Sequence, residues 1–131
     1  MTKDELISEC LKMPDSFVDY PFATAPTTAL IKNAKGKMFA FTDFANSERI
    51  KKSCGTDAPV SDGDLFLNLK CDPALIEILK AQYKAVLFGY CSNRNHWITI
   101  IIDKDVSLKE LRKMIQLSFD LVSGIKKSDV K

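Results

Sequence analysis

Glycine and histidine are scarce in this chain of 131 residues, which contains five glycines and a single histidine. The glycines form neither a phosphate-binding loop nor a dinucleotide-binding fingerprint, both of which need closely spaced glycines. A metal site normally needs three or four ligands, whereas His96 and Cys91 supply two, and Cys71 is the one candidate for a third. We therefore expect no bound metal and no cofactor.

Paired catalytic groups are also missing from the sequence. Cys91 and His96 fall within one expected turn, but the proximity of a thiol and an imidazole along the chain does not by itself make a nucleophile and its base. No two carboxylates stand out as an acid and a base. We interpret the protein as one without enzymatic activity.

Long apolar runs are absent as well. No segment approaches the roughly 20 apolar residues that a membrane-spanning helix needs. Residues 1–6 carry acids where a signal peptide would need an apolar run. The four cysteines include no C-x-x-C pair, and such a scatter is typical of a reducing compartment. We expect a cytoplasmic protein with no membrane contact.

The residues that are present suit one globular domain. Hydrophobic residues make up 46% of the chain and charged residues 27%, which predicts a single domain over residues 1–124 and a frayed tail at 125–131. The net charge is only +2, but residues 32–52 hold six bases against two acids, and residues 80–97 hold three bases and no acid. This unevenness either steers an anionic partner or reflects chance clustering on a solvated surface.

Capping and hydrophobic periodicity predict three helices. One covers residues 2–13 after a capping box of Thr2 and Glu5, a second follows Asp72, and a third runs from a capping box at Ser107 to about Gly124. Strands are predicted at 27–32, 37–42, 64–70, 85–90 and 96–102, with loops at 14–26 and 43–63. The expected fold is therefore a two-layer α+β domain, with helices on one face of an antiparallel sheet.

A one-sided helix layer would leave the other sheet face open. Alternation within the strands predicts that this face carries Phe66, Asn68, Lys70, Trp97 and Thr99. The residues Lys37, Phe39 and Phe41 also alternate together, on a face that the sequence does not decide. The aromatic and polar side chains then form a binding surface, unless the segment 43–63 or a second copy of the chain covers them.

Several segments resemble the MmcQ/YjbR family of small bacterial proteins. The matching segments are Asp19–Phe22, Lys37–Ala40, Leu69–Pro73, Gly89–Tyr90, Asn93–Arg94 and His96–Thr99. The resemblance implies the order α-β(3)-α-β(2)-α, similar to secretion chaperones, and a DNA-binding role with a double-wing arrangement. Two departures are Cys91, where the family usually has histidine, and a longer segment at 43–63.

Three hypotheses for function follow. The first is a DNA-binding module of low sequence specificity, and the second is a chaperone-like or self-associating interaction module. The third is a binder of small ligands, or an enzyme, with Lys70, Tyr90, Asn93 and His96 in a pocket. The isoelectric point of about 8.3 is low for a dedicated nucleic-acid domain. The candidate site residues shared by these hypotheses are Lys37, Lys70, Tyr90, Asn93, Arg94, His96, Trp97 and Thr99.

The DNA hypothesis also assigns roles to the bases and to three other side chains. The residues expected to contact phosphate are Lys32, Lys35, Lys37, Lys51, Lys52, Lys70 and Arg94, and those expected to contact bases or sugars are Tyr90, Asn93 and Trp97.

Overall fold

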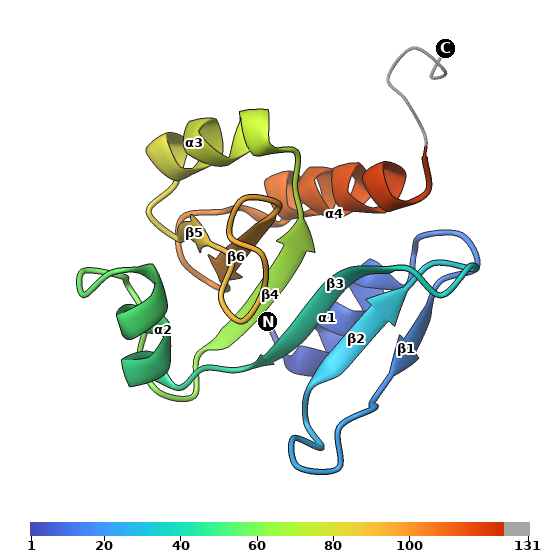
Figure 1. Cartoon of the computed structure of the whole chain (residues 1–131), viewed down its shortest axis with the longest axis horizontal. Coiled ribbons are helices and arrows are strands. Elements are labelled where there is room, and N and C mark those ends of the chain that lie inside the picture. The colour runs from blue at the N-terminus through green and yellow to red at the C-terminus, as the bar shows by residue number, and fades with distance from the viewer. Residues whose placement is uncertain (125–131) are drawn as a thin grey trace.

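One six-stranded antiparallel sheet organises the computed structural model, which describes residues 1–124 (Figure 1). The strand order across the sheet is β1-β2-β3-β4-β6-β5. The elements along the chain are α1 (Lys3–Cys10), β1 (Phe17–Asp19), β2 (Ala29–Lys32), β3 (Met38–Phe44), α2 (Ser47–Cys54), β4 (Leu65–Lys70), α3 (Pro73–Gln82), β5 (Val86–Phe88), β6 (Trp97–Ile101) and α4 (Leu108–Val122). The tail predicted at 125–131 lies outside the described residues.

The predicted α+β class and all three predicted helices are confirmed. Thr2 accepts a hydrogen bond from the Glu5 amide, and the Glu5 carboxylate accepts one from the Thr2 amide, which completes the capping box of α1. The side chains of Asp72 and Ser107 cap α3 and α4 in the same manner, without the reciprocal bond. None of the helices in residues 1–124 combines the length and apolar character needed to span a membrane.

The larger core lies between the sheet and three helices. Leu6 and Cys10 of α1, Ile76 of α3 and the apolar stripe of α4 pack on inward-facing residues of the strands. Phe39 and Phe119 meet edge to face with ring centroids 5.3 Å apart. This layer corresponds to the helix layer predicted from the sequence.

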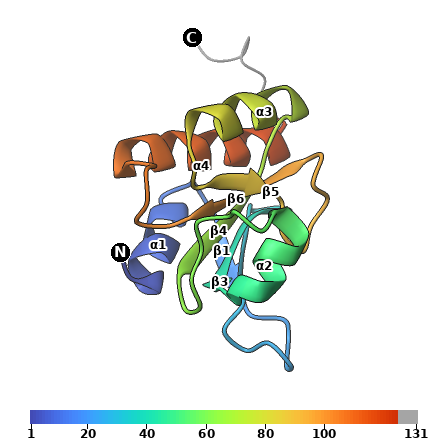
Figure 2. The ribbon, with the colours of Figure 1, turned by 90° about the vertical axis from the view of Figure 1, so that its left-hand side faces the viewer.

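A second, smaller core occupies the opposite sheet face. The predicted loop 43–63 contains α2, whose only buried residue, Ile50, packs in a cluster with Trp97 and Phe66. Figure 2 shows α1 and α2 on opposite sides of the sheet. The prediction that 43–63 is entirely loop is therefore wrong, and of the two alternatives for this face, the one in which 43–63 covers Trp97 and Phe66 is correct.

Two further differences concern the N-terminal half of the sheet. The predicted loop 14–26 contains the three-residue edge strand β1. In β3, the pairing with β2 shifts between Ile31 and Lys32, so that Phe39 and Ala40 both enter the larger core. The predicted common face of Phe39 and Phe41 is wrong because this bulge sends Phe41 to the α2 side.

Candidate functional site: a groove on the sheet face beside α2

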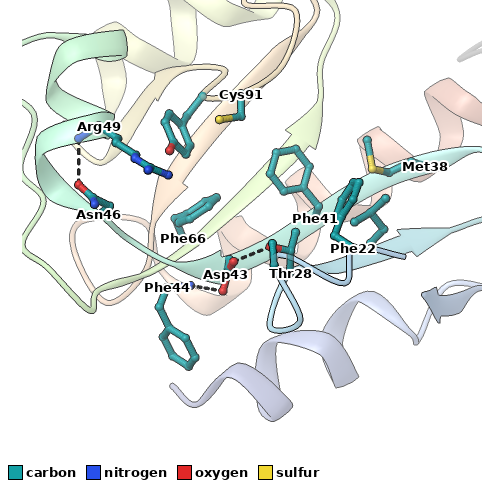
Figure 3. Close-up of a pocket in the computed structure, with 13 residues that line it drawn as sticks. Phe22, Thr28, Met38, Phe41, Asp43, Phe44, Asn46, Arg49, Phe66 and Cys91 are labelled. Atoms are coloured by element: carbon teal, nitrogen blue, oxygen red, sulfur yellow. Dashed lines mark hydrogen bonds between the residues drawn. The ribbon is translucent and has the colours of Figure 1, made fainter. Parts of the chain in front are cut away.

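A groove of about 410 Å³ lies on the sheet face that α2 only partly covers. It runs between α2 and the loop 20–28 that joins β1 to β2, and Figure 3 shows its side chains converging from both sides. The lining residues are Phe22, Ala25, Thr28, Leu30, Met38, Phe41, Asp43, Phe44, Asn46, Arg49, Phe66, Tyr90 and Cys91. Clefts of this size commonly hold small organic molecules.

Aromatic rings form the floor of the groove. The Phe41 and Phe66 rings lie edge to face at 6.2 Å, and Phe66 and Tyr90 do so at 5.7 Å. Phe41 pairs with Asn68 of β4, which places both side chains on the same face of the sheet. The bulge in β3 therefore builds this floor, because without it Phe41 would stay on the side of Phe39.

Arg49 provides the charge on the α2 side. Asn46 caps α2 by accepting a hydrogen bond from the Arg49 amide at 3.1 Å, and this cap fixes the first turn beside the groove. The Arg49 side chain is exposed and extends toward the cavity in Figure 3. The ion pairs within 4.0 Å among residues 1–124 use other cations, so the Arg49 guanidinium has no carboxylate partner there.

The carboxylate of Asp43, on the opposite rim, already accepts hydrogen bonds at both of its oxygens. Its carboxylate accepts hydrogen bonds from the hydroxyl groups of Thr27 at 2.8 Å and Thr28 at 2.6 Å, and from the Phe44 amide at 2.8 Å. Partial burial acts to raise the pKa of Asp43, but these hydrogen bonds outweigh it and hold the pKa below its ordinary value. The Lys3 ammonium lies 3.8 Å away. The contacts also fasten the end of loop 20–28 to β3.

Tyr90 and Cys91 close the groove next to α2. Burial, followed by the contact with Cys91, raises the pKa of the Tyr90 phenol, which keeps the phenol protonated at neutral pH. Cys91 is exposed and has a φ of 55°, a left-handed conformation that is uncommon for a residue other than glycine. Among residues 1–124 no hydrogen bond joins Cys91 to His96, and no cluster of three or more metal-ligating residues occurs.

Two of the predicted site residues are buried behind the groove. Thr99 is fully buried and donates to Asn68 Oδ1 at 2.7 Å, while Asn68 Nδ2 donates to the Tyr90 carbonyl at 2.6 Å. Trp97 is 8% exposed and packs on Phe41 at 6.1 Å. The prediction that Trp97 and Thr99 face an open surface is therefore wrong, since α2 and the segment after it cover them.

The other predicted residues spread over three regions. Of all eight, only Tyr90 lines the groove. The Lys70 ammonium lies 5.6 Å from the centre of the Trp97 ring. The residues Asn93, Arg94 and His96 are exposed in the β5–β6 connection, and Lys37 is exposed in the β2–β3 turn. Of the residues expected in one pocket, Lys70, Tyr90, Asn93 and His96, the groove therefore includes Tyr90 alone.

Sequence reasoning missed most of the groove. Phe22 lies in an expected loop, and the positions of Met38 and Phe41 depend on the bulge, so neither strand alternation nor helix periodicity points to them. Arg49 is one of six bases in a charged stretch, and nothing local distinguishes it from the others. A usable signal existed at Asn46, since asparagine three residues before Arg49 can cap a helix.

Comparison with known proteins places this arrangement in a family. The sequence model of YjbR matches residues 11–121. The chain belongs to the YjbR family. YyaQ, an uncharacterised protein of Bacillus subtilis, is 25% identical over 122 residues, which cover 92% of this chain and 98% of YyaQ. YbdF, an uncharacterised protein of Escherichia coli O157:H7, is 36% identical over 67 residues, which cover 50% of this chain and 55% of YbdF.

Solved structures show that this YjbR-family protein shares its fold with two other bacterial proteins. A Deinococcus radiodurans protein with a DUF419 domain superposes with a TM-score of 0.70 at 30% identity, covering 98% of this chain and 84% of that one. A Pseudomonas syringae protein superposes with a TM-score of 0.77 at 22% identity, covering 92% of this chain and 98% of that one. The resemblance inferred from the sequence is thereby confirmed.

Proposed function

We propose that this YjbR-family chain is a binding module without enzymatic activity, whose groove takes a small organic anion with a flat apolar body. The observation that carries this proposal is the combination of an aromatic floor with a cation at the rim, Arg49, that has no carboxylate within 4.0 Å among residues 1–124. The hypothesis of a small-ligand binder places Tyr90 in its pocket, and Tyr90 lines the groove.

The apolar body is inferred from the floor. Leu30, Met38, Phe41 and Phe66 present carbon surface and no charge, so a planar hydrocarbon or heteroaromatic group would remove apolar area from water on both sides. Stacked or edge-to-face contacts between rings add to that stabilisation. A strongly polar ligand would gain nothing from this surface.

The negative charge is inferred from the rim. Because the Lys3 ammonium lies 3.8 Å from the Asp43 carboxylate, whose oxygens also accept from two hydroxyl groups and an amide, the charge at the cavity with no ion-pair partner within 4.0 Å among residues 1–124 is that of Arg49. A guanidinium binds a carboxylate, phosphate or sulfonate through two parallel hydrogen bonds. A cationic ligand would instead be repelled by Arg49.

The absence of catalysis is inferred from the protonation states at the groove. Asp43 is held ionised by its hydrogen-bond donors, and Tyr90 is held neutral by burial, so neither group is poised to exchange a proton near pH 7. Assays for turnover are therefore expected to show none, and binding assays are the appropriate test.

Two fluorescent probes separate the apolar and anionic parts of the proposal. Anilinonaphthalene sulfonate carries a flat ring system and a sulfonate, and N-phenylnaphthylamine is its uncharged analogue. We expect Arg49→Gln to weaken sulfonate binding about tenfold, as the loss of a charge-assisted hydrogen bond predicts, and to leave the uncharged probe unaffected. Lys52→Gln, an equal charge change on the exposed side of α2, is the matched control.

Two results would overturn the proposal. One is equal weakening of the sulfonate probe by Arg49→Gln and Lys52→Gln, which would indicate general charge attraction. The other is binding of both probes that is insensitive to Ala25→Trp, a substitution that would fill the groove from the loop 20–28. Each variant is compared with the wild-type chain by urea unfolding, so that a disordered protein is not mistaken for a weakened site.

DNA binding is the second candidate, and its support is the set of bases that remain exposed around α2. The exposed bases are Arg49 and Lys52 on α2 and Arg94 in the β5–β6 connection. If about 3–4 such groups neutralise phosphates, the logarithm of the affinity falls with the logarithm of salt concentration with a slope of about −3 to −4. Fluorescence anisotropy with a labelled duplex measures this slope, and absence of binding at low salt would remove the candidate.

A further inference from the structure

The edge strand β5 ends in an aromatic ring that carries two cations. The Lys80 ammonium, from α3, lies 3.2 Å from the centre of the Phe88 ring. The guanidinium carbon of Arg94, from the β5–β6 connection, lies 4.5 Å from the same centre. Because both distances share one end point, the two charges are less than about 8 Å apart. In Figure 1, β5 forms the sheet margin next to α2 and α3.

Neither cation forms an ion pair with an acid in the part of the chain that the structure describes. The ion pairs within 4.0 Å among residues 1–124 involve neither Lys80 nor Arg94, and the sequence has no acid between residues 80 and 97. Both cations also act on the Cys54 thiol, where they oppose the burial that raises its pKa. The thiol of Cys54, the last residue of α2, donates a hydrogen bond to the Phe88 carbonyl at 3.2 Å, so α2 ends beside the residue whose ring carries both cations.

Two like charges held this close repel each other, and the Phe88 ring offsets only part of that repulsion. An anion bound by both would remove it. The flat guanidinium of Arg94 suits a bidentate contact with an oxyanion, and the ammonium of Lys80 adds a point charge. We propose that Lys80 and Arg94 form a phosphate site at the margin of β5, which is separate from the groove and does not depend on the function proposed for it.

Titration with inorganic phosphate tests the site on the whole chain. Proton–nitrogen correlation spectra are recorded while sodium phosphate replaces sodium chloride at constant ionic strength. We expect saturable shifts of the Arg94 Nε–H signal and of the Phe88 and Gly89 amides, with affinity lowered at least tenfold in Lys80→Gln/Arg94→Gln. The control Lys109→Gln/Lys113→Gln removes the same charge from two exposed lysines of α4 and should change the affinity less than twofold.

The source of the phosphate is distinguished in a second arm with a labelled DNA duplex. A larger loss of duplex affinity in the Lys80/Arg94 variant than in the control assigns the site to a nucleic-acid backbone. Equal losses, with phosphate binding still abolished, assign it to a free phosphate or phosphomonoester. If the double variant does not fold, Arg94→Lys is used in its place. This substitution keeps the charge but removes the bidentate guanidinium, and it should lower the phosphate affinity by an intermediate amount.

Phosphate shifts of equal size in both double variants, or no saturable shift near Phe88, would overturn the proposal. Neither result bears on the groove, because the probes of the groove respond to Arg49 and to Ala25, which lie outside this site.

Discussion

Thr99 holds together the polar network behind the groove. Its hydroxyl donates to Asn68 Oδ1 at 2.7 Å and accepts from the Tyr90 amide at 2.8 Å. Both Thr99 and Asn68 are fully buried, so their polar atoms depend on one another in place of water. The network fixes the backbone at Tyr90 and thereby the wall of the groove.

Thr99→Val should cost about 2 kcal/mol of unfolding free energy, because a side chain of the same shape leaves Asn68 Oδ1 and the Tyr90 amide without a partner. Equilibrium urea unfolding, followed by the fluorescence of Trp97, measures the change. Thr99→Ser keeps the hydroxyl and should recover most of the loss. A valine variant as stable as a Thr24→Val control, made at an exposed loop position, would contradict the network's role.

At the scale of elements, α2 is a helix that the hydrophobic pattern of the sequence does not predict. Only Ile50 of its eight residues is buried, so the segment has no apolar repeat for periodicity to detect. Strand β1 has three residues, too few for alternation to be recognised. The bulge in β3 inverts Phe41 relative to Phe39, and nothing local in the sequence encodes it. The groove is built from these features, which explains why its residues were mostly missed.

The long elements, in contrast, could be predicted because their signals are local and repeated. The N-caps Thr2, Asp72 and Ser107 all occupy their expected positions. Strand β4 places Leu65, Leu67 and Leu69 in the larger core, as the alternation of its residues indicated. The fold could therefore be predicted from the sequence, whereas the site could not, because it depends on tertiary contacts.

Ser107→Ala should destabilise the protein by about 1 kcal/mol, since the serine oxygen accepts a hydrogen bond from the Glu110 amide at the start of α4. Urea unfolding gives the difference. Ser8→Ala, on the exposed side of α1, serves as the control and should be neutral or slightly stabilising because alanine favours helix. An unchanged midpoint for Ser107→Ala would mean that the cap contributes nothing to stability.

At the scale of the whole molecule, one ion pair connects helices α1 and α4. Arg112 of α4 binds Glu9 of α1 through Nε to Oε2 at 2.8 Å and through a second nitrogen to Oε1 at 3.0 Å. The hydrogen bonds from Arg112 are the main cause that lowers the pKa of Glu9 to about 2, against partial burial that acts to raise it. The ionised carboxylate is therefore favoured in the folded state.

The pH dependence of stability should reflect this pair. Its contribution is fully present above the unfolded pKa of Glu9, about 4.5, and is lost as the pH falls from there toward about 2. Because the Arg112 side chain is half exposed, we expect a contribution of about 1 kcal/mol. Glu9→Gln and Arg112→Gln should each lose less stability than the wild-type chain between pH 6 and pH 3, as measured by urea unfolding. Identical pH profiles for all three proteins would contradict this account.

The most direct test of the central claim is to map where anilinonaphthalene sulfonate binds, using proton–nitrogen correlation spectra of the labelled protein. The groove predicts saturable shifts at the amides of Met38, Phe41, Arg49, Phe66 and Tyr90, with little change along α1 and α4. In Arg49→Gln the same amides should shift, but only at about tenfold higher probe concentration. Shifts centred on the exposed faces of α1 or α4, or none that saturate, would contradict the claim that this groove is the binding site of the protein.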